Sequence, residues 1–236
     1  MKFAIIQFPG SNCDQDCLAA LNGMAGLQAE YVWHKETSVD GFDAIVLPGG
    51  FSYGDYLRCG AIAHFSPIMP SVVQEARNGR LVIGICNGFQ ILCEIGLLPG
   101  ALVRNRSLHF VCEMVTTRVE VVDSLFTHGS PQGTLLRFPV AHGEGCFFAD
   151  ETTLRELNER RQVILRYVMP DGRLDSAANP NGSIENIAGI CNREGNVFGL
   201  MPHPDRACEQ RLGSSDGAKI FRSMMETIEA ARARAA

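Results

Sequence analysis

Residues 81–90, Leu81-Val82-Ile83-Gly84-Ile85-Cys86-Asn87-Gly88-Phe89-Gln90, join an apolar run to a helix-like segment through a Gly-x-Cys-x-Gly turn. A sharp turn from strand to helix holds its central residue in strained backbone angles and crowds the positions two before and two after it. Glycine supplies the room that this crowding requires. The stretch therefore predicts a nucleophile elbow with Cys86 at its tip.

The helix that follows the elbow favours a thiolate at Cys86. The N-terminus of a helix has a partial positive charge and free N–H groups, which stabilise an anion. The alternative is a buried core cysteine beside coincidental glycines, and we accept it for the other eight of the nine cysteines. Cys86 differs from them because it has the strand, turn and helix that the motif requires.

Apolar runs recur through the first part of the chain. Runs at 3–8, 44–47 and 81–85 alternate with amphipathic segments at 13–24 and 67–78. This alternation is typical of βαβ units around a parallel sheet, and uninterrupted apolar strands suit a sheet that is covered on both faces. We predict an α/β fold with a doubly wound, mostly parallel sheet.

The pattern changes beyond Gly100, where residues 114–122 alternate between apolar and polar side chains. Such alternation is typical of an antiparallel strand with one face toward water. Turn residues mark 170–183 as a loop, and 216–235 is predicted to be a helix. Further short strands are predicted at 135–141, 163–168, 187–191 and 197–201. We therefore expect added antiparallel strands in the second half, with residues 1–236 forming a single domain.

The composition resembles that of an ordinary enzyme, with 46% apolar and 20% charged residues. The net charge is −5, and lysine and arginine form no basic stripe, so we expect no nucleic-acid partner. The chain begins with an apolar strand-like run rather than a basic region followed by a cleavage site. We therefore predict a cytoplasmic protein without a membrane partner.

No metal or cofactor site is predicted in this chain. Nine cysteines are an odd number in a chain too large to need disulfides, and Cys13 and Cys17 have no second pair at a zinc-like spacing. The His142-Gly143-Glu144 triplet resembles part of the zinc deaminase motif but lacks its Pro-Cys-x-x-Cys segment, so a structural turn or a partner-facing loop is expected. Residues 49–55 match neither a phosphate loop nor a dinucleotide loop, which argues against an ATP site.

A thiolate nucleophile also needs a general base, and His203 is the best candidate among six histidines. The segment Met201-Pro202-His203-Pro204-Asp205 follows a predicted strand, and its prolines fix the backbone. Residues two apart in an extended segment point to the same side, so Asp205 can orient the imidazole. The alternative is that Asp205 caps a turn and His203 lies on the surface. Because the elbow favours catalysis, we predict a triad of Cys86, His203 and Asp205.

The oxyanion of the reaction needs hydrogen-bond donors near Cys86. A Gly49-Gly50 pair follows the predicted strand at 44–47, and a glycine backbone can approach a reacting carbonyl more closely than any other. We predict that the N–H groups of Gly50 and Asn87 are the donors. The remaining histidines are expected to be packing or surface residues, and they are His34, His64, His109 and His128.

These motifs together resemble those of the class I, or triad-type, glutamine amidotransferases. Residues 84–90 match the Gly-x-Cys-x-Gly-x-Gln pattern of that family, and 203–205 correspond to its late His-Pro-Glu, with an aspartate that is one methylene shorter. The resemblance implies a flavodoxin-like sheet and a triad that hydrolyses glutamine. It further implies that Gln90 contacts the substrate glutamine and that residues 105–110 help to hold its amino-acid end.

One branch of that family, the glutaminase subunits of phosphoribosylformylglycinamidine synthases, resembles nearly the whole chain. The segments that carry this resemblance are 8–12, 48–55, 141–145 and 179–183. It implies that the ammonia serves an amidine-forming step of de novo purine synthesis. It also implies two partners: a large synthetase subunit that binds ATP, Mg²⁺ and phosphoribosylformylglycinamide, and in many bacteria a small bridging subunit.

Three other interpretations of the elbow stay open. A peptidase or stress protein on a related sheet usually has a histidine directly after the cysteine, whereas this chain has Asn87. A noncatalytic interaction module would not need the triad. An amidotransferase of another pathway is disfavoured by the segments around His142 and Asn179.

Overall fold

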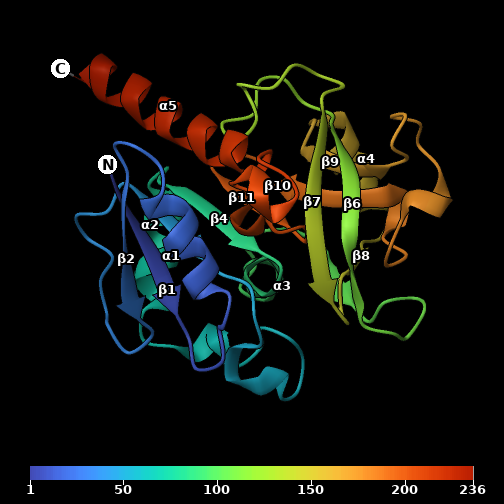
Figure 1. Cartoon of the computed structure of the whole chain (residues 1–236). Helices are drawn as coiled ribbons and strands as arrows, with labels where there is room; N and C mark the ends of the chain where they lie inside the picture. Colours follow the sequence, from blue (N-terminus) through green and yellow to red (C-terminus); the bar gives the residue numbers. More distant parts are fainter. Residues whose placement is uncertain (236) are drawn as a thin grey trace.

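The structure is a computed structural model that describes residues 1–235, and Figure 1 shows its helices packed around a central sheet. The strands are β1 (Lys2–Gln7), β2 (Gln28–Trp33), β3 (Ala44–Leu47), β4 (Leu81–Ile85), β5 (Ala101–Val103), β6 (Val111–Val119), β7 (Leu135–His142), β8 (Cys146–Phe148), β9 (Val163–Val168), β10 (Ile187–Cys191) and β11 (Val197–Leu200). The α-helices are α1 (Asp14–Asn22), α2 (Met69–Arg77), α3 (Asn87–Glu94), α4 (Glu151–Glu159) and α5 (Gly217–Ala235). Six short 3₁₀ turns, η1 to η6, lie between them.

The main sheet has nine strands in the order β2-β1-β3-β4-β11-β10-β9-β6-β7. Its first five strands are parallel, in the 2-1-3-4-5 order of flavodoxin-like sheets, with β11 as the fifth. The other four are joined by antiparallel pairings. The predicted parallel sheet with antiparallel strands added in the second half is therefore confirmed.

Helices cover both sides of the parallel strands, as expected for a doubly wound sheet. In Figure 1, α1 lies in front of β1, whereas α2 and α3 lie behind the sheet. Strands β3 and β4 are buried along their whole length, which explains why both are uninterrupted apolar runs. All nine cysteines are free thiols in the structure.

Some elements lay outside the predictions. Strand β2 is an edge strand in which only Ala29 and Val32 are buried, so its sequence QAEYVW has no continuous apolar run. Helix α4 begins after Asp150, whose carboxylate caps the helix by accepting a hydrogen bond from the Thr153 N–H at 2.8 Å. Strand β6 begins three residues earlier than the predicted 114–122, because it pairs with β7 from Val111 onward.

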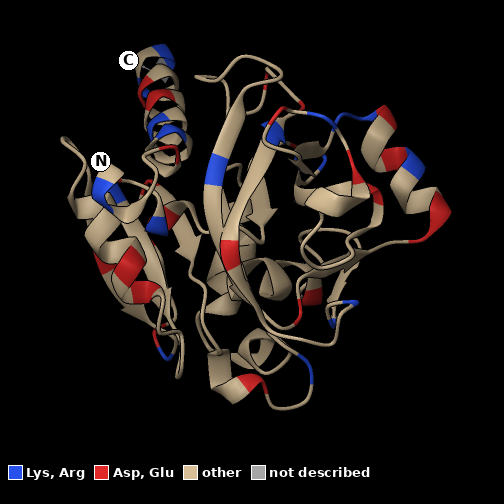
Figure 2. Ribbon diagram, turned by 45° about the vertical axis from the view of Figure 1, so that its right-hand side comes forward, with Lys and Arg blue, Asp and Glu red and all other residues tan. Residues whose placement is uncertain are grey.

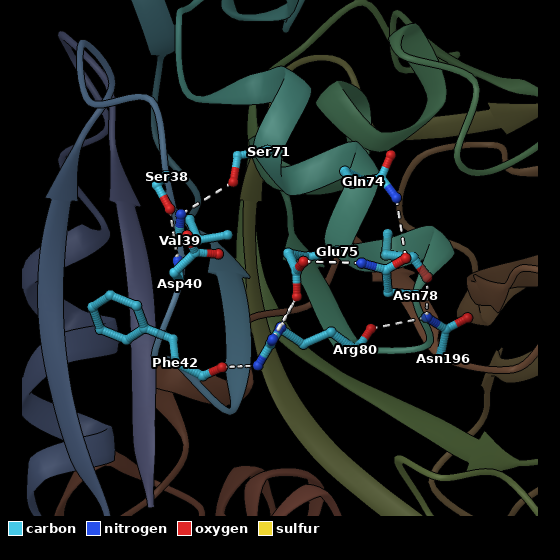
Figure 3. Close-up of polar contacts among 11 residues, drawn as sticks. Ser38, Val39, Asp40, Phe42, Ser71, Gln74, Glu75, Asn78, Arg80 and Asn196 are labelled. Carbon is cyan, nitrogen blue, oxygen red and sulfur yellow. Dashed lines mark hydrogen bonds and ion pairs between the residues drawn. The ribbon is translucent and has the colours of Figure 1, made fainter.

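A polar network ties together the segments at the amino ends of three parallel strands (Figure 3). The Arg80 guanidinium, just before β4, donates to the Phe42 carbonyl oxygen and pairs with Glu75. The Asn196 side chain, just before β11, donates to the carbonyl oxygens of Ala76 and Arg80 at 2.7 and 2.8 Å. Hydrogen bonds thus join the segments at the amino ends of these strands, whereas Gly50, Cys86 and His203 follow their carboxyl ends.

Charged residues of both signs are interspersed over the molecule. Figure 2 shows acidic and basic positions mixed along both α4 and α5. No helix in residues 1–235 combines the length and the apolar character needed to cross a membrane. In the same part of the chain, no three His, Cys, Asp or Glu side chains gather as a possible metal site.

Candidate active site

Three neighbouring parallel strands end at the same edge of the sheet and carry the predicted site residues. Gly50 follows β3, Cys86 follows β4, and His203 follows β11. Ligands of open α/β sheets bind outside the carboxyl ends of the strands, which is where these residues meet. The fold thus brings together positions that are far apart in the sequence.

Cys86 occupies a strained turn at the start of α3. Its φ and ψ are 51° and −105°, outside the regions that a non-glycine residue ordinarily occupies. A Cβ on Gly88 would overlap the carbonyl oxygen of Leu47, and one on Gly84 would lie 2.6 Å from the carbonyl oxygen of Gly88. The Cys86 N–H donates to the Leu200 carbonyl oxygen at 2.8 Å. The structure thus has the predicted elbow, with glycines where side chains would clash.

His203 and Asp205 are buried side by side. The Nδ1 atom of His203 is 3.3 Å from Asp205 Oδ1 and 3.5 Å from Oδ2. Asp205 lies in the 3₁₀ turn η5 (Pro204–Arg206), so the prediction that an extended backbone brings it to His203 was wrong. The turn nevertheless points the carboxylate back at the imidazole, and the predicted pair is in contact.

Electrostatics favour a charged imidazole at His203. Burial alone would lower the pKa of this ring, but the negative charges of Asp205 and of a Cys86 thiolate outweigh it and raise the pKa to about 10. Within residues 1–235, His203 Nε2 has no hydrogen-bond partner. Because Nδ1 faces Asp205, Nε2 is the atom left to exchange a proton near Cys86.

The predicted oxyanion donors lie beside each other at the ends of β3 and β4. Gly50 has a φ of +122°, which favours glycine, and the Ser52 N–H donates to the Asn87 side-chain oxygen at 3.1 Å. Among the residues that the structure describes, neither the Gly50 N–H nor the Asn87 N–H has a hydrogen-bond acceptor. Two free N–H groups close to a cysteine can receive a developing negative charge.

Gln90 is buried one turn into α3. Its side-chain oxygen accepts a hydrogen bond from the Asn87 amide at 2.8 Å, and its Nε2 donates to the Glu144 carbonyl oxygen at 2.6 Å. Gln90 thus connects the elbow to residues 143–145. Its contact with the substrate glutamine stays a prediction.

The 105–110 segment borders the same region. Asn105 is fully buried, donates to the His142 carbonyl oxygen at 2.9 Å and accepts from the Gly145 N–H at 2.9 Å. Phe110 stacks on Phe51 from the loop after Gly50, with ring centroids 6.5 Å apart. The role of residues 105–110 in holding the amino-acid end of glutamine also stays a prediction.

His142 is a site neighbour that the sequence reasoning treated only as part of a turn or loop. It is buried, and burial together with the nearby positive charge of His203 lowers its pKa to about 4. The carbonyl oxygen of the preceding Ala141 is 3.8 Å from Cys86 Sγ. The period-two alternation of 135–141 continues through residue 142, and that signal would have predicted an inward-facing histidine.

The elbow, the buried acid–base pair and the flavodoxin-like order agree with a comparison of protein families. The family model of the CobB/CobQ-like glutamine amidotransferase domain matches residues 1–226. The chain belongs to this glutamine amidotransferase family. The match covers every site residue described above, from Gly50 to Asp205.

Named relatives of this amidotransferase domain are similar over almost their whole length. The phosphoribosylformylglycinamidine synthase subunit PurQ of Gloeobacter violaceus is 58% identical, with 95% of this chain and 97% of the relative covered. The PurQ subunit of Moorella thermoacetica is 56% identical, with 97% of each chain covered. Both relatives bear the name of the branch that the sequence resembles.

Solved structures agree with the fold of the amidotransferase domain. A chain of PurLQS from Thermotoga maritima superposes with a TM-score of 0.85 at 43% identity and covers 95% of this chain and 97% of its own. A glutamine amidotransferase from the same organism has a TM-score of 0.55 at 15% identity, with 98% of this chain and 85% of its own covered. The second likeness concerns the fold alone.

Proposed function

We propose that this chain is the glutaminase subunit of phosphoribosylformylglycinamidine synthase. It hydrolyses glutamine to glutamate and ammonia, and the ammonia serves the ATP-dependent conversion of phosphoribosylformylglycinamide to phosphoribosylformylglycinamidine in purine biosynthesis. The observation that carries this proposal is the strained Cys86 elbow beside the buried His203–Asp205 pair, in a chain that is 58% identical to a PurQ subunit. The name of the relatives supplies the pathway, and the geometry supplies the chemistry.

The first half of the reaction forms a thioester. The Cys86 thiolate attacks the side-chain amide carbon of glutamine, and the N–H groups of Gly50 and Asn87 receive the oxyanion. The His203 imidazolium then gives a proton to the nitrogen as the C–N bond breaks and ammonia leaves. The raised pKa of His203 suits this step, because the ring holds a proton at neutral pH.

The second half returns the enzyme to its starting state. Neutral His203 takes a proton from water, which attacks the γ-glutamyl thioester and releases glutamate from Cys86. Asp205 holds the imidazole in place and stabilises its positive charge through the contact at Nδ1. Gln90 and residues 105–110 are proposed to bind the rest of the glutamine.

The proposed function requires partners. One relative is part of PurLQS from Thermotoga maritima, so we propose that this chain assembles with two others, a small bridging subunit and the large synthetase subunit. ATP and Mg²⁺ are proposed to bind to the synthetase, in agreement with the missing phosphate loop in 49–55. We further propose that residues 1–236 form one domain and act in the cytoplasm.

The direct test is the Cys86→Ala variant in the complex reconstituted with its synthetase partner. We expect glutamine hydrolysis to be lost, while synthesis with added ammonia continues, because the change leaves the synthetase intact. Both activities are measured on the same preparation, with the wild-type complex as the control. Full glutamine hydrolysis by the variant would refute the assignment of Cys86 as nucleophile.

A further inference from the structure

The loop that follows Gly50 contains several residues in left-handed backbone conformations. The φ angles are +56° at Tyr53, +53° at Asp55 and +72° at Leu57. Side-chain-bearing residues adopt this region at a cost in free energy and keep it only where the surroundings impose it. A loop with a predicted oxyanion donor at its start therefore needs contacts that preserve its shape.

The hydroxyl group of Tyr53 makes two such contacts. Its oxygen is 2.7 Å from His34 Nδ1 and 2.8 Å from Ser66 Oγ. Both partners are buried, with 6% of His34 and 3% of Ser66 exposed. Burial and the positive charge of Lys35 lower the pKa of His34, which favours the neutral ring, and a neutral ring can accept the hydroxyl proton at Nδ1.

The groups that hold Tyr53 are themselves fixed to regular elements. The His34 N–H donates to the Gln7 carbonyl oxygen at the end of β1, at 3.0 Å, and the Ile68 N–H donates to the His34 carbonyl oxygen at 3.2 Å. The Tyr53 N–H donates to the Pro9 carbonyl oxygen at 2.6 Å. Backbone and side chain together thus anchor this residue to the end of a core strand and to the turn before α2.

The backbone between Tyr53 and Gly50 is fixed as well. The Phe51 N–H donates to the Gly10 carbonyl oxygen at 2.9 Å, and the Ser52 N–H donates to the Asn87 side chain at 3.1 Å. Only three peptide bonds separate Gly50 from Tyr53. Because the N–H groups of Phe51 and Ser52 are hydrogen-bonded, few backbone torsions in this short segment are free to absorb a shift. A movement of Tyr53 would therefore displace the Gly50 N–H.

We propose that Tyr53, held by His34 and Ser66, is a positioning residue that aims the Gly50 N–H at the oxyanion formed during glutamine hydrolysis. The inference rests on the proposed glutaminase function. Tyr53 is hydrogen-bonded to His34, Ser66 and Pro9, and it acts on the site through the loop. Its contribution belongs to the transition state rather than to substrate binding, because negative charge develops on the oxygen only as the tetrahedral intermediate forms.

The test is Tyr53→Phe, which removes only the hydroxyl group, in the reconstituted complex. We expect kcat for glutamine hydrolysis to fall on the order of ten- to a hundredfold, the range for a misplaced oxyanion donor. KM should stay within about threefold, because ground-state binding is unchanged. Alkylation of Cys86 by iodoacetamide forms no oxyanion, so its rate should be retained. Tyr31→Phe, at a half-exposed tyrosine of β2, is the matched control.

A second pair of variants tests His34, the hydrogen-bond partner of the Tyr53 hydroxyl group. His34→Asn keeps a polar group close to the position of Nδ1 and should retain most of the wild-type kcat. His34→Leu removes it and should lower kcat about as much as Tyr53→Phe does, and the double variant should show no further loss if both act through one contact. If Tyr53→Phe does not fold, this pair makes the same comparison.

Two results would overturn the positioning role. One is a folded Tyr53→Phe variant that keeps kcat within about twofold of wild type. The other is a fall in kcat that is matched by a loss of iodoacetamide reactivity and a rise in KM, since that would indicate general loosening of the site. Absence of glutamine hydrolysis in the wild-type complex would instead refute the proposed function. The two failures are therefore distinguishable.

Discussion

At the scale of single residues, the backbone of Cys86 is strained and its surroundings keep it so. A non-glycine residue at a φ of 51° is destabilised by roughly 1–3 kcal/mol. The strain persists because the Cys86 N–H is bonded to Leu200 in β11 and because Gly88 packs directly on Leu47 of β3. The nucleophile is thus held by the two strands on either side of its own.

Gly88→Ala should disrupt this arrangement. The added methyl group would overlap the Leu47 carbonyl oxygen, which is backbone and cannot rotate away. We expect a loss of stability of about 1–3 kcal/mol from overpacking, together with a large loss of glutaminase activity as the elbow moves. Thermal unfolding and glutamine hydrolysis measure the two effects. Gly129→Ala, whose nearest neighbour is the rotatable Ser223 hydroxyl at 3.3 Å, is the control and should change little.

The buried His142 ring should make the stability of the fold depend on pH. Its pKa is lowered to about 4 in the folded chain, against about 6.5 in an unfolded one. Between these values the unfolded chain binds a proton that the folded chain does not, so stability falls as the pH falls from about 6.5 to 4. The resulting loss in the free energy of unfolding between pH 6.5 and pH 4 is on the order of 3 kcal/mol.

The measurement is the free energy of unfolding of His142→Asn and wild type across that pH range. We expect the variant to lose less stability on acidification, because it lacks the titrating ring. His64→Asn, at an exposed histidine, is the control and should follow wild type. Parallel curves for His142→Asn and wild type would show that burial of this ring does not govern the acid response.

At the scale of elements, the polar network at the amino ends of the strands stabilises the sheet (Figure 3). Asn196→Ala would remove the side-chain donor to the Arg80 carbonyl oxygen and one donor to the Ala76 carbonyl oxygen, which also accepts from the Gly79 N–H at 3.0 Å. We expect a loss of about 1–3 kcal/mol, seen as a fall of roughly 2–10 °C in Tm. Activity below that temperature should be retained, because the site lies at the other edge of the sheet. Asn78→Ala, at an exposed member of the network, should shift Tm far less.

Among the strands, the degree of burial decided which ones could be predicted from the sequence. Strands β3 and β4 were predictable because burial on both faces leaves an uninterrupted apolar run, and the elbow was predictable because its glycines are a local steric requirement. Edge strand β2 was not predictable, since only two of its six residues are buried and its register comes from pairing with β1.

For the candidate site, the residue types were easier to predict than the path of the backbone. His203 and Asp205 were expected to be neighbours, yet they meet through a 3₁₀ turn that no periodicity announces. The contacts of Tyr53 with His34 and Ser66 join segments that have no sequence relation to each other. Such long-range contacts depend on the packing of the whole sheet.

At the scale of the whole molecule, the site combines the two halves of the sheet. The parallel half provides Cys86 and His203, and the antiparallel half provides Ala141 and His142 at the end of β7. Phe51 and Phe110 stack on each other near the site while remaining 47% and 54% exposed. Aromatic groups left in water beside an active site favour a function that is completed by another protein.

The last prediction concerns this dependence: the isolated chain should hydrolyse glutamine slowly, and the assembled complex should do so faster. In the chain alone, Cys86 Sγ lies 3.8 Å from the Ala141 carbonyl oxygen, whereas His203 Nε2 makes no hydrogen bond among residues 1–235. No hydrogen bond therefore joins His203 Nε2 to the thiol, although Cys86 lies near enough to raise the pKa of the imidazole. A partner that repositions the loops would align the two groups, and a correction of about 1 Å in such an alignment can change rates by on the order of 100-fold.

Glutamine hydrolysis by the isolated chain and by the complex, at equal chain concentration, measures the effect. We expect kcat/KM to rise at least about tenfold on assembly, with Cys86→Ala inactive in both states. Coupling of this kind also limits ammonia release when no acceptor is present. Such a limit avoids waste, because free ammonia becomes unreactive ammonium in neutral water. An isolated chain as active as the complex would mean that its triad is already aligned, and the partner would then serve only to receive ammonia.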